Sequence, residues 1–573
     1  MRIVKKILIT LLLLHTSASI LYGDSNVSEE ENNISNLLKQ EFKKNRIPLL
    51  KHLSNKRFLR TFYYKNNYNP LWIDNNGLKD KKYQELFKNI NNDITLSRDG
   101  VLFKKSELLQ KELDANISKE RLFRVEVQLT SLYYEFLKHA IYGEIEWKDF
   151  ATRLHRLKRY RINAKWVRKE PNFDISKLLI NPDINATIKE IKPKKFGYDK
   201  LLKALTKLYT LKKNGGWKKL PYFKVLKLKS TGEVVLKLRE RLKASGDYIS
   251  CEENRTIPYI NKEENNESLQ KPYIDPNAIF GTCLDKAVKH FQKRHGLEID
   301  GIVGGATQKA LNETVDEKIE RVLLNIDRIK WLPRDDDKRY IIVNIPEFML
   351  YYIEDNKVKK DIRVIIGAKK HPTPIFSEEI SYIVLNPYWK IPAGILKREI
   401  IPKTIKNIHY LKKQGLVIHR TWNERSQIIN PYHIYWEQYL ARGVKFPYRI
   451  MQPPGKKNAL GKIKFKFPNM FDVYLHDTPT RHLFKKDVRA FSHGCVRIAE
   501  PHSLLETVSS FNKNIDMSKA DKILKGKRKV IYNIKNKLPI HLVYLTAGFN
   551  SSGELEFRDD IYGYDKLMKR SIK

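Results

Sequence analysis

Two short stretches, Phe471-Asp-Val-Tyr-Leu-His476 and Ser492-His493-Gly494-Cys495-Val496-Arg497, decide what kind of domain the second half of this sequence builds. The first reads as an apolar strand that ends at a histidine, where a side chain can project from a sheet edge into a cleft. The glycine before Cys495 allows the backbone to turn sharply. Fifteen residues separate His476 from Ser492, which is enough for a loop to bring the cysteine back beside the histidine.

A cysteine paired with a histidine indicates nucleophilic catalysis. His476 would accept the thiol proton of Cys495 and later pass a proton to a leaving amine. Backbone N–H groups around Gly494 and Cys495 are the expected oxyanion donors, while Ser492 shares their loop and His493 orients it. We expect Tyr474 to contact substrate.

Other interpretations of these residues stay open. Cys495 also fits a buried small hydrophobe, and His476 fits an ordinary hydrogen-bonded histidine. Arg497 either holds a substrate carboxylate or pairs structurally within the domain. Two histidines and a cysteine also resemble part of a zinc set, but no CxxC or HExxH motif completes one, so no metal is expected.

The residues around this motif predict a β-rich domain with an insertion. Beyond Lys338 the apolar period changes from about 3.6 to 2 residues, which is typical of strands. The expected strands are Tyr340–Asn344, Met349–Ile353, Ile362–Ile366, Tyr382–Leu385 and Asp472–Leu475, with a hairpin turn at Glu354–Lys357. About 60 residues, Pro392–Arg449, interrupt the domain and exceed an ordinary loop, so they predict a lid or subdomain over the site.

The first half of the chain is predicted to be helical. From Ile34 to about Leu205 the pattern is mostly that of helices, with one apolar face formed by Val125, Leu129, Leu132, Tyr133 and Phe136. Tyr68–Trp72 reads as a loop with aromatic anchors. Residues 228–312 form a separate helical unit, in which Ser230 or Thr231 caps one helix and Thr282–Asp285 forms a capping box. Thr314 with Glu317 predicts a further capped helix that ends at Trp331.

Composition excludes several classes of protein. The 573 residues are 41% hydrophobic and 30% charged, and Lys and Arg exceed Asp and Glu by 44 charges. Three cysteines exclude a disulfide scaffold, and beyond the N-terminus no apolar run is long enough for a polytopic membrane protein. The basic excess suits an anionic wall polymer, a membrane surface or nucleic acid. Nucleic acid is disfavoured because no nucleic-acid module is present and the chain is predicted to be exported.

The N-terminus carries the pattern of a secretory signal. Basic Arg2, Lys5 and Lys6 precede an aliphatic run at Ile7–Leu14, and the small residues of Thr16–Ser19 follow, with Gly23 before the acidic Asp24. Cleavage after Ser19 or Gly23 and an uncleaved inner-membrane anchor are both compatible with this pattern. We therefore expect an exported, periplasmic protein. In that oxidising compartment Cys251 and Cys283 either pair or stay free, and free thiols are the expectation.

Two segments resemble known families. The run FQKRHGLEIDGIVGGATQKALN at 291–312 resembles the three-helix peptidoglycan-binding module, although a helical spacer with no ligand gives the same pattern. The histidine followed by Ser-His-Gly-Cys-Val-Arg resembles the active-site signature of the L,D-transpeptidase catalytic domain. Asn386-Pro-Tyr-Trp389 and Leu475-His-Asp-Thr-Pro479 resemble the large periplasmic branch of that family. Many members have Asn where this chain has Arg497, but the large periplasmic branch has Arg.

The resemblance implies a fold and a division of the chain. The fold is α+β and multidomain, with a helical N-terminal scaffold, a three-helix peptidoglycan-binding-like module and a β-sandwich-like catalytic domain with an inserted lid. The expected parts are a signal or anchor at 1–23, a scaffold at 24–227, the module at 228–312, a connecting helix at 313–337, the catalytic domain at 338–510 with its lid at 392–449, and a C-terminal segment at 511–573 that packs on the scaffold or the catalytic domain.

The resemblance also implies a reaction. Cys495 would attack the diaminopimelate carbonyl of a tetrapeptide stem, release D-Ala, and pass the acyl group to a second stem's amine to form a 3→3 cross-link. Carbapenems acylate the same cysteine in family members, and no cofactor is implied. The expected partners are peptidoglycan stem peptides, with peptidoglycan synthases or a D,D-carboxypeptidase as candidates. The rival functions are an L,D-carboxypeptidase or endopeptidase of the same fold, and a non-catalytic wall-binding scaffold.

Overall fold

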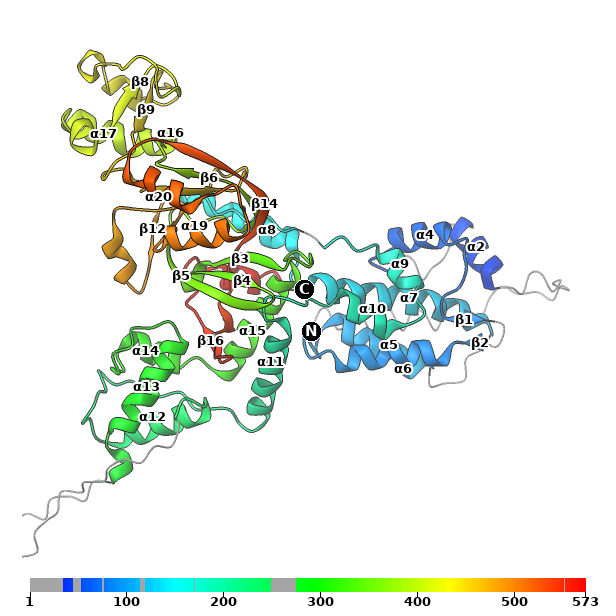
Figure 1. Cartoon of the computed structure of the whole chain (residues 1–573). Coiled ribbons are helices and arrows are strands. Elements are labelled where there is room, and N and C mark those ends of the chain that lie inside the picture. Colours follow the sequence, from blue (N-terminus) through cyan, green and yellow to red (C-terminus); the bar gives the residue numbers. More distant parts are fainter. Residues whose placement is uncertain are drawn as a thin grey trace, which may run out of the picture.

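The structure is a computed structural model that describes residues 34–44, 53–74, 77–113, 119–169, 171–248, 275–550 and 552–572. A helical N-terminal region, a small helical module and a β-rich domain meet near the centre of the molecule, and a further subdomain projects from the β-rich domain (Figure 1). This agrees with the predicted α+β organisation. Within the described residues, no helix is long and apolar enough to cross a membrane. The predicted signal at 1–23 lies outside the described residues.

The N-terminal region is a group of helices packed around α7. Its helices are α2 (Ile34–Lys44), α4 (Lys56–Lys65), α5 (Asp80–Asn92), α6 (Val101–Leu113), α7 (Lys119–Tyr142), α9 (Ile175–Ile180) and α10 (Ile184–Ile191). The predicted apolar face of α7 is confirmed, because all five of its residues are buried. The Tyr68–Trp72 loop is also anchored as expected: Trp72 is fully buried, and Glu126 of α7 accepts hydrogen bonds from the N–H groups of Leu71 and Trp72.

The small helical module has its own core. It contains α12 (Glu233–Ala244), α13 (Thr282–Arg294) and α14 (Gly305–Leu311), which bury Leu238, Leu284 and Phe291 among other apolar side chains. Cys283 of α13 is disulfide-bonded, so the expectation of a free thiol there was wrong. Cys495 is a free cysteine, and Cys251 lies outside the described residues.

Two predicted helix caps in this module were wrong, and one after it was right. Glycines occupy the N-cap positions of α12 and α13, at Gly232 and Gly281, and no side chain caps either helix. Ser230 lies too early for α12, and its hydroxyl instead accepts the N–H of Lys227. The helix that follows the module, α15 (Val315–Lys330), does begin with the predicted capping box of Thr314 and Glu317.

The β-rich domain is built on one sheet of nine strands in the order β12-β5-β13-β11-β10-β6-β14-β3-β4, and β4 also pairs with β5. The pairings therefore close into a ring around an apolar core. This is the β-rich domain that the family resemblance implied as β-sandwich-like. The strands are β3 (Arg339–Asn344), β4 (Met349–Glu354), β5 (Lys357–Gly367), β6 (Phe376–Leu385), β10 (Ile463–Lys466), β11 (Leu475–His476), β12 (Ala490–Ser492), β13 (Val496–Ile498) and β14 (Val530–Val543).

Segments from both ends of the chain complete this domain. The interior strand β14 pairs with β6 and β3, so the sheet extends past the boundary predicted at residue 510. Helices α19 (Pro501–Ser510) and α20 (Met517–Lys525) pack on the same core, and α8 (Trp147–Arg156) of the helical region does so too. The strand predicted at Asp472–Leu475 is shorter than expected, because Asp472 has a φ of 52°, outside the β region.

The insertion is a subdomain with its own core. The subdomain is bounded by β7 (Trp389–Lys390) at its start and β9 (Arg449–Gln452) at its end. These two strands form a three-stranded sheet with β8 (Val417–His419). The helical segments α16 (Ala393–Ile395), η5 (Leu396–Ile400), α17 (Ile401–Lys406) and α18 (Tyr410–Gln414) pack on this sheet. A separate core means that the insertion can keep its structure as a unit, as expected of a subdomain rather than a loop.

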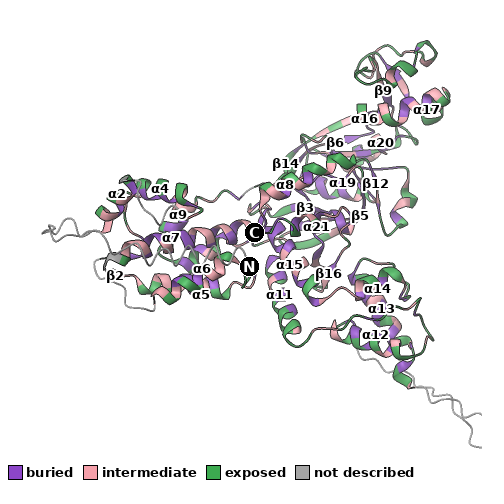
Figure 2. Ribbon diagram, turned by 180° about the vertical axis from the view of Figure 1, so that it is seen from behind, coloured by how far each residue is buried: buried purple, intermediate pink, exposed green. Residues whose placement is uncertain are grey.

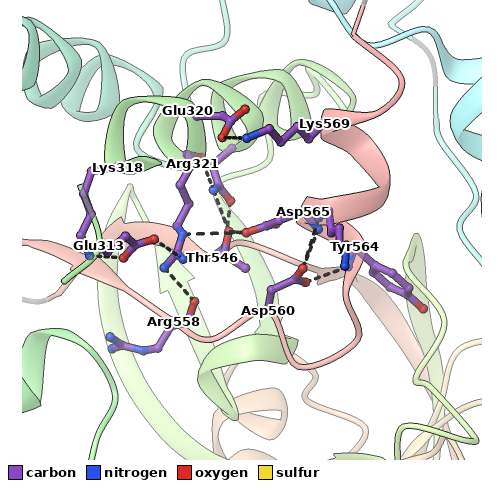
Figure 3. A network of polar contacts seen from close by, with 12 residues as sticks. Glu313, Lys318, Glu320, Arg321, Thr546, Arg558, Asp560, Tyr564, Asp565 and Lys569 are labelled. Atoms are coloured by element: carbon purple, nitrogen blue, oxygen red, sulfur yellow. Dashed lines mark hydrogen bonds and ion pairs between the residues drawn. The ribbon is translucent and has the colours of Figure 1, made fainter. Parts of the chain in front are cut away.

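The helix α15 joins the parts of the molecule. Buried residues lie on this helix and on α7 (Figure 2). Arg328 and Arg321 of α15 both form ion pairs with Asp565, which lies in α21 (Tyr564–Lys569) near the C-terminus. Figure 3 shows Arg321 beside Asp565 and Thr546. The Arg328–Asp565 distance is 2.5 Å, and the Thr546 hydroxyl donates a hydrogen bond of 2.9 Å to the same carboxylate. Since Arg328 is only 3% exposed, its buried guanidinium needs the Asp565 carboxylate as a counter-charge.

The helical module docks on the hairpin of β15 (Ala547–Phe549) and β16 (Leu555–Phe557). His290 of α13 lies 2.9 Å from the Glu554 carboxylate, and Arg294 donates a 2.7 Å hydrogen bond to the Leu555 carbonyl. The buried Lys318 of α15 meets His295 of the module at 2.9 Å. These polar contacts attach the module to the same C-terminal segment that completes the sheet.

We expect Asp565→Asn to destabilise the protein by about 3 kcal/mol, because it leaves the buried Arg328 charge without its partner. Chemical denaturation followed by tryptophan fluorescence measures this. Lys569→Met is the matched control, since its ion pair with Glu320 is exposed and should contribute less than about 1 kcal/mol. Equal effects of the two substitutions would contradict the assigned role of Asp565.

Candidate active site

Cys495 lies in the tight connection between β12 and β13. Two hydroxyl groups hold this connection. Ser492 Oγ donates a 2.5 Å hydrogen bond to the Cys495 carbonyl and accepts the Gly494 N–H at 3.1 Å. Thr373 Oγ1 donates a 2.9 Å hydrogen bond to the Gly494 carbonyl and accepts the Gly367 N–H at 2.8 Å. The position of the thiol is therefore set by groups on either side of the turn.

Glycine is required at position 494 by backbone conformation. Its φ of +112° lies in a region that side chains with a Cβ rarely adopt. A Cβ there would meet only carbonyl oxygens at 3.8 and 3.9 Å, so space is not the constraint. The Gly494 N–H is already paired with Ser492, whereas the Cys495 N–H has no acceptor among the described residues. Of the two amides that the sequence suggested as oxyanion donors, the amide of Cys495 is the one that is unpaired.

His476 lies beside this turn on the neighbouring strand. Strands β11 and β13 pair in parallel, with Leu475 opposite Val496 and His476 opposite Arg497. The same register places Cys495 level with Tyr474, two residues before His476, so the side chains of His476 and Cys495 lie on the same face of neighbouring strands. The His476 ring is 4% exposed, and its Nδ1–H donates a 2.6 Å hydrogen bond to the Asp477 carbonyl. Because a carbonyl can only accept, the proton sits on Nδ1 and Nε2 keeps its lone pair.

The electrostatics keep both groups neutral at rest. Burial, reinforced by the nearby positive charge of Arg497, lowers the pKa of His476 to about 3. Burial raises the pKa of the Cys495 thiol, while hydrogen bonds to Tyr474 and the charge of Lys464 act in the opposite direction. The thiol itself is directed at the Asp472 carbonyl, 3.9 Å from Sγ. The resting pair is thus a thiol and an imidazole rather than an ion pair.

Tyr474 lies behind the thiol. It is 6% exposed, its ring centroid is 5.6 Å from that of His476, and it hydrogen-bonds with Cys495. The ammonium nitrogen of Lys464 lies 3.6 Å from the centroid of the same ring. The residue predicted to contact substrate is therefore buried and lies against His476 and Cys495.

Arg497 is partly buried and has spare hydrogen-bonding capacity. One of its terminal nitrogens donates a 3.1 Å hydrogen bond to Thr480 Oγ1, and its buried Nε has no partner. No acidic side chain among the described residues forms an ion pair with it. Arg497 thus pairs with Thr480 within the domain, and both roles predicted for it, structural pairing and binding of a substrate carboxylate, stay predictions.

His493 connects the active-site loop to the lid. Its Nε2 lies 2.5 Å from the carboxylate of Glu399 in η5, and its ring stacks on His371 with centroids 4.8 Å apart. Sequence reasoning expected His493 to orient the loop but did not find Glu399, His371 or Lys464. The alternation Ile463-Lys464-Phe465-Lys466 was the available signal for Lys464, because it places two lysines on one face of a strand. Among the described residues, no group of three or more metal-ligating side chains is arranged to hold a metal ion.

Comparison with protein families matches the parts of the chain to known domains. Residues 338–525 match the L,D-transpeptidase catalytic domain, residues 57–205 match a scaffold domain, and residues 265–311 match a peptidoglycan-binding domain. This chain carries an L,D-transpeptidase catalytic domain. The resemblance found in the sequence is confirmed, and the matched L,D-transpeptidase segment contains both His476 and Cys495.

A curated relative supports the same assignment. A Haemophilus influenzae protein named "Putative L,D-transpeptidase" is 32% identical over 249 residues, which is 44% of this chain and 49% of that protein. The match thus spans about half the length of the relative. Solved L,D-transpeptidases from Stackebrandtia nassauensis (14% identity, TM-score 0.20, 57% of this chain and 96% of that one) and Mycobacterium smegmatis (10%, 0.18, 37% and 61%) are also similar, at TM-scores too low to compare the L,D-transpeptidase domains.

We expect the reactivity of Cys495 toward iodoacetamide to be low at pH 6–7 and to rise continuously to above pH 9. The reason is that burial raises the thiol pKa, so the reactive thiolate is populated only as the pH increases. Intact mass spectrometry across a pH series measures the rate, with Cys495→Ala as background. A plateau that begins below pH 7 would mean that a thiolate–imidazolium pair already exists at rest.

Gly494→Ala should reduce the rate of Cys495 acylation at least tenfold, because the side chain forces the turn out of its φ of +112° and displaces the thiol and the Cys495 amide. Single-turnover acylation by a carbapenem checks this. Gly548→Ala is the control, since that glycine has open space and no positive φ. If Gly494→Ala were acylated at the wild-type rate, the conformation of the turn would not limit acylation of Cys495.

Proposed function

We propose that the protein is a peptidoglycan L,D-transpeptidase that forms 3→3 cross-links through a Cys495 acyl-enzyme. The observation that carries this proposal is the placement of a free thiol beside an unpaired backbone amide and a histidine with a free Nε2, on neighbouring strands of an L,D-transpeptidase domain. The peptidoglycan-binding match at 265–311 supports the same substrate.

In the first half of the reaction, His476 Nε2 takes the thiol proton as Sγ attacks the diaminopimelate carbonyl of a tetrapeptide stem. The Cys495 N–H stabilises the negative charge on the carbonyl oxygen. The C–N bond to the terminal D-Ala then breaks, and His476 returns the proton to the departing amine. A thioester between Cys495 and the stem remains.

In the second half, the side-chain amine of diaminopimelate in another stem attacks the thioester. His476 accepts a proton from this amine and passes it to the departing thiol. The low pKa of His476 means that its imidazole is neutral before each step, with Nε2 available to accept the proton. The partly exposed guanidinium of Arg497 is the candidate group for binding a stem carboxylate.

The lid and the other domains assist this reaction. The lid reaches the active-site loop through Glu399 and His493, so its position affects access to the thiol and exclusion of water. Action on peptidoglycan is extracytoplasmic, in agreement with the signal pattern, and we assign the protein to the periplasm. Stem peptides are its substrates, and a peptidoglycan synthase or a D,D-carboxypeptidase is a candidate partner.

Intact mass spectrometry with a carbapenem is the direct test. One covalent adduct on the wild type and none on Cys495→Ala are expected, and His476→Gln should form the adduct at least 100-fold more slowly, as loss of a general base requires. A folded wild type without an adduct would contradict the role of Cys495 and favour a wall-binding scaffold. Product analysis with a tetrapeptide donor, with and without an amine acceptor, then separates cross-linking from release of a tripeptide by water.

A further inference from the structure

We propose that Lys464 is a positioning residue of the active site, whose ammonium group stabilises the thiolate of Cys495 as it forms. This inference rests on the proposed role of Cys495 as nucleophile and adds a residue for which the active-site motif gives no signal. Lys464 lies on β10, and its Cα is directly opposite that of His476 across the β10–β11 pairing. Side chains of directly opposite residues lie on the same face of a sheet and within reach of each other.

Tyr474 contacts both Lys464 and the thiol of Cys495. The Lys464 ammonium lies 3.6 Å from the centroid of the Tyr474 ring, a cation–π contact that fixes both groups. Tyr474 in turn hydrogen-bonds with Cys495. One side of the thiol is therefore formed by the Tyr474 ring, which has the Lys464 ammonium on it. The aromatic ring, rather than an acidic side chain, holds this positive charge in place.

The charge of Lys464 is not neutralised by a local ion pair. Within the described part of the chain Lys464 forms no salt bridge, whereas Lys466, two residues further on the same strand, is paired with Asp472. The charged and titratable groups that face Lys464 are Lys390, Lys466, Asp472, Tyr474, His476 and Cys495. Of these, the Cys495 thiolate would be the anion created by the reaction, which makes it the natural counter-charge for this ammonium.

Burial, followed by repulsion from Lys466, lowers the pKa of Lys464 to about 8. Below pH 8 Lys464 is charged, lowers the pKa of the Cys495 thiol and keeps His476 neutral, and so ready to accept a proton. Above pH 8 Lys464 loses its charge, and its effect on the thiol fades. The contribution of Lys464 should therefore be largest near neutral pH.

The test compares Lys464→Met, Lys464→Arg and Lys466→Met in the full chain, by the rate at which iodoacetamide alkylates Cys495 between pH 6.5 and 9.5. Iodoacetamide is neutral, so the rate follows the thiolate population. Lys464→Met should react about tenfold more slowly than the wild type at pH 7, equivalent to a rise of about one unit in the thiol pKa, and the two profiles should converge above pH 9. Lys464→Arg should recover most of the rate because it restores the charge. Lys466→Met should slow alkylation far less than Lys464→Met, because the Lys466 ammonium lies further from the Tyr474 ring, at 5.1 Å, and is paired with Asp472.

Three results would overturn the proposal: an unchanged rate in Lys464→Met, a slow rate that does not converge with the wild type at high pH, or equal slowing by Lys466→Met. The second of these would indicate that the side chain only fills space. Thermal melting checks folding, and Lys464→Gln replaces Lys464→Met if the latter melts early. Alkylation requires no peptidoglycan, so a wild type that alkylates normally but forms no cross-link would refute the proposed function while leaving this test intact.

Discussion

The parallel pairing of β11 with β13 is the constraint on which the active site depends. It places His476 opposite Arg497, and so puts the histidine beside the turn that carries Cys495. Parallel neighbours need a crossover between them, and residues 477–495, which include β12 and the turn at Gly494, supply it. Because both strands lie within a closed ring of pairings, neither can slide by one residue without turning its side chains to the opposite face. The relative position of Cys495 and His476 is thus a property of the whole sheet.

The surroundings of this pair combine burial with positive charge. Lys464 and Arg497 both face it, and neither has an acidic partner among the described residues. Burial alone would make a thiolate costly, and the cations partly offset this. The same cations oppose an imidazolium at His476, so a resting ion pair is disfavoured. This balance suits an enzyme that forms its reactive thiolate together with substrate binding, rather than one that stores it.

The outer parts of the molecule converge on the C-terminal segment. The strand β14 completes the sheet, the β15–β16 hairpin receives the helical module through Glu554, and Asp565 binds the connecting helix α15 through Arg328. The inserted subdomain is joined to the catalytic domain at β7 and β9, pairs with Lys529 beside β14 through Glu424, and contacts the active-site loop through Glu399. The helical module and the inserted subdomain therefore contact the rest of the molecule through different segments.

The sequence by itself determined the features that depend on neighbouring residues. The apolar face of α7, the capping box of α15, the hairpin of β4 and β5 and the turn at Gly494 are local patterns, and each appears where it was expected. The predicted caps of α12 and α13 were local patterns as well, but they were wrong. Gly232 and Gly281 occupy the two N-cap positions, so the hydroxyl groups expected to cap these helices do not lie there.

Only the tertiary structure decided which distant residues surround the thiol and which protonation states they adopt. Lys464 is 31 residues from Cys495 and Glu399 is 96 residues away, so no spacing rule links them to the motif. The inclusion of β14 in the catalytic sheet and the disulfide at Cys283 likewise depend on contacts between separate segments. The neutral state of His476 follows from burial and from the charge of Arg497. Burial is a property of the packed chain, because the low dielectric that shifts a pKa exists only after the strands and helices have assembled.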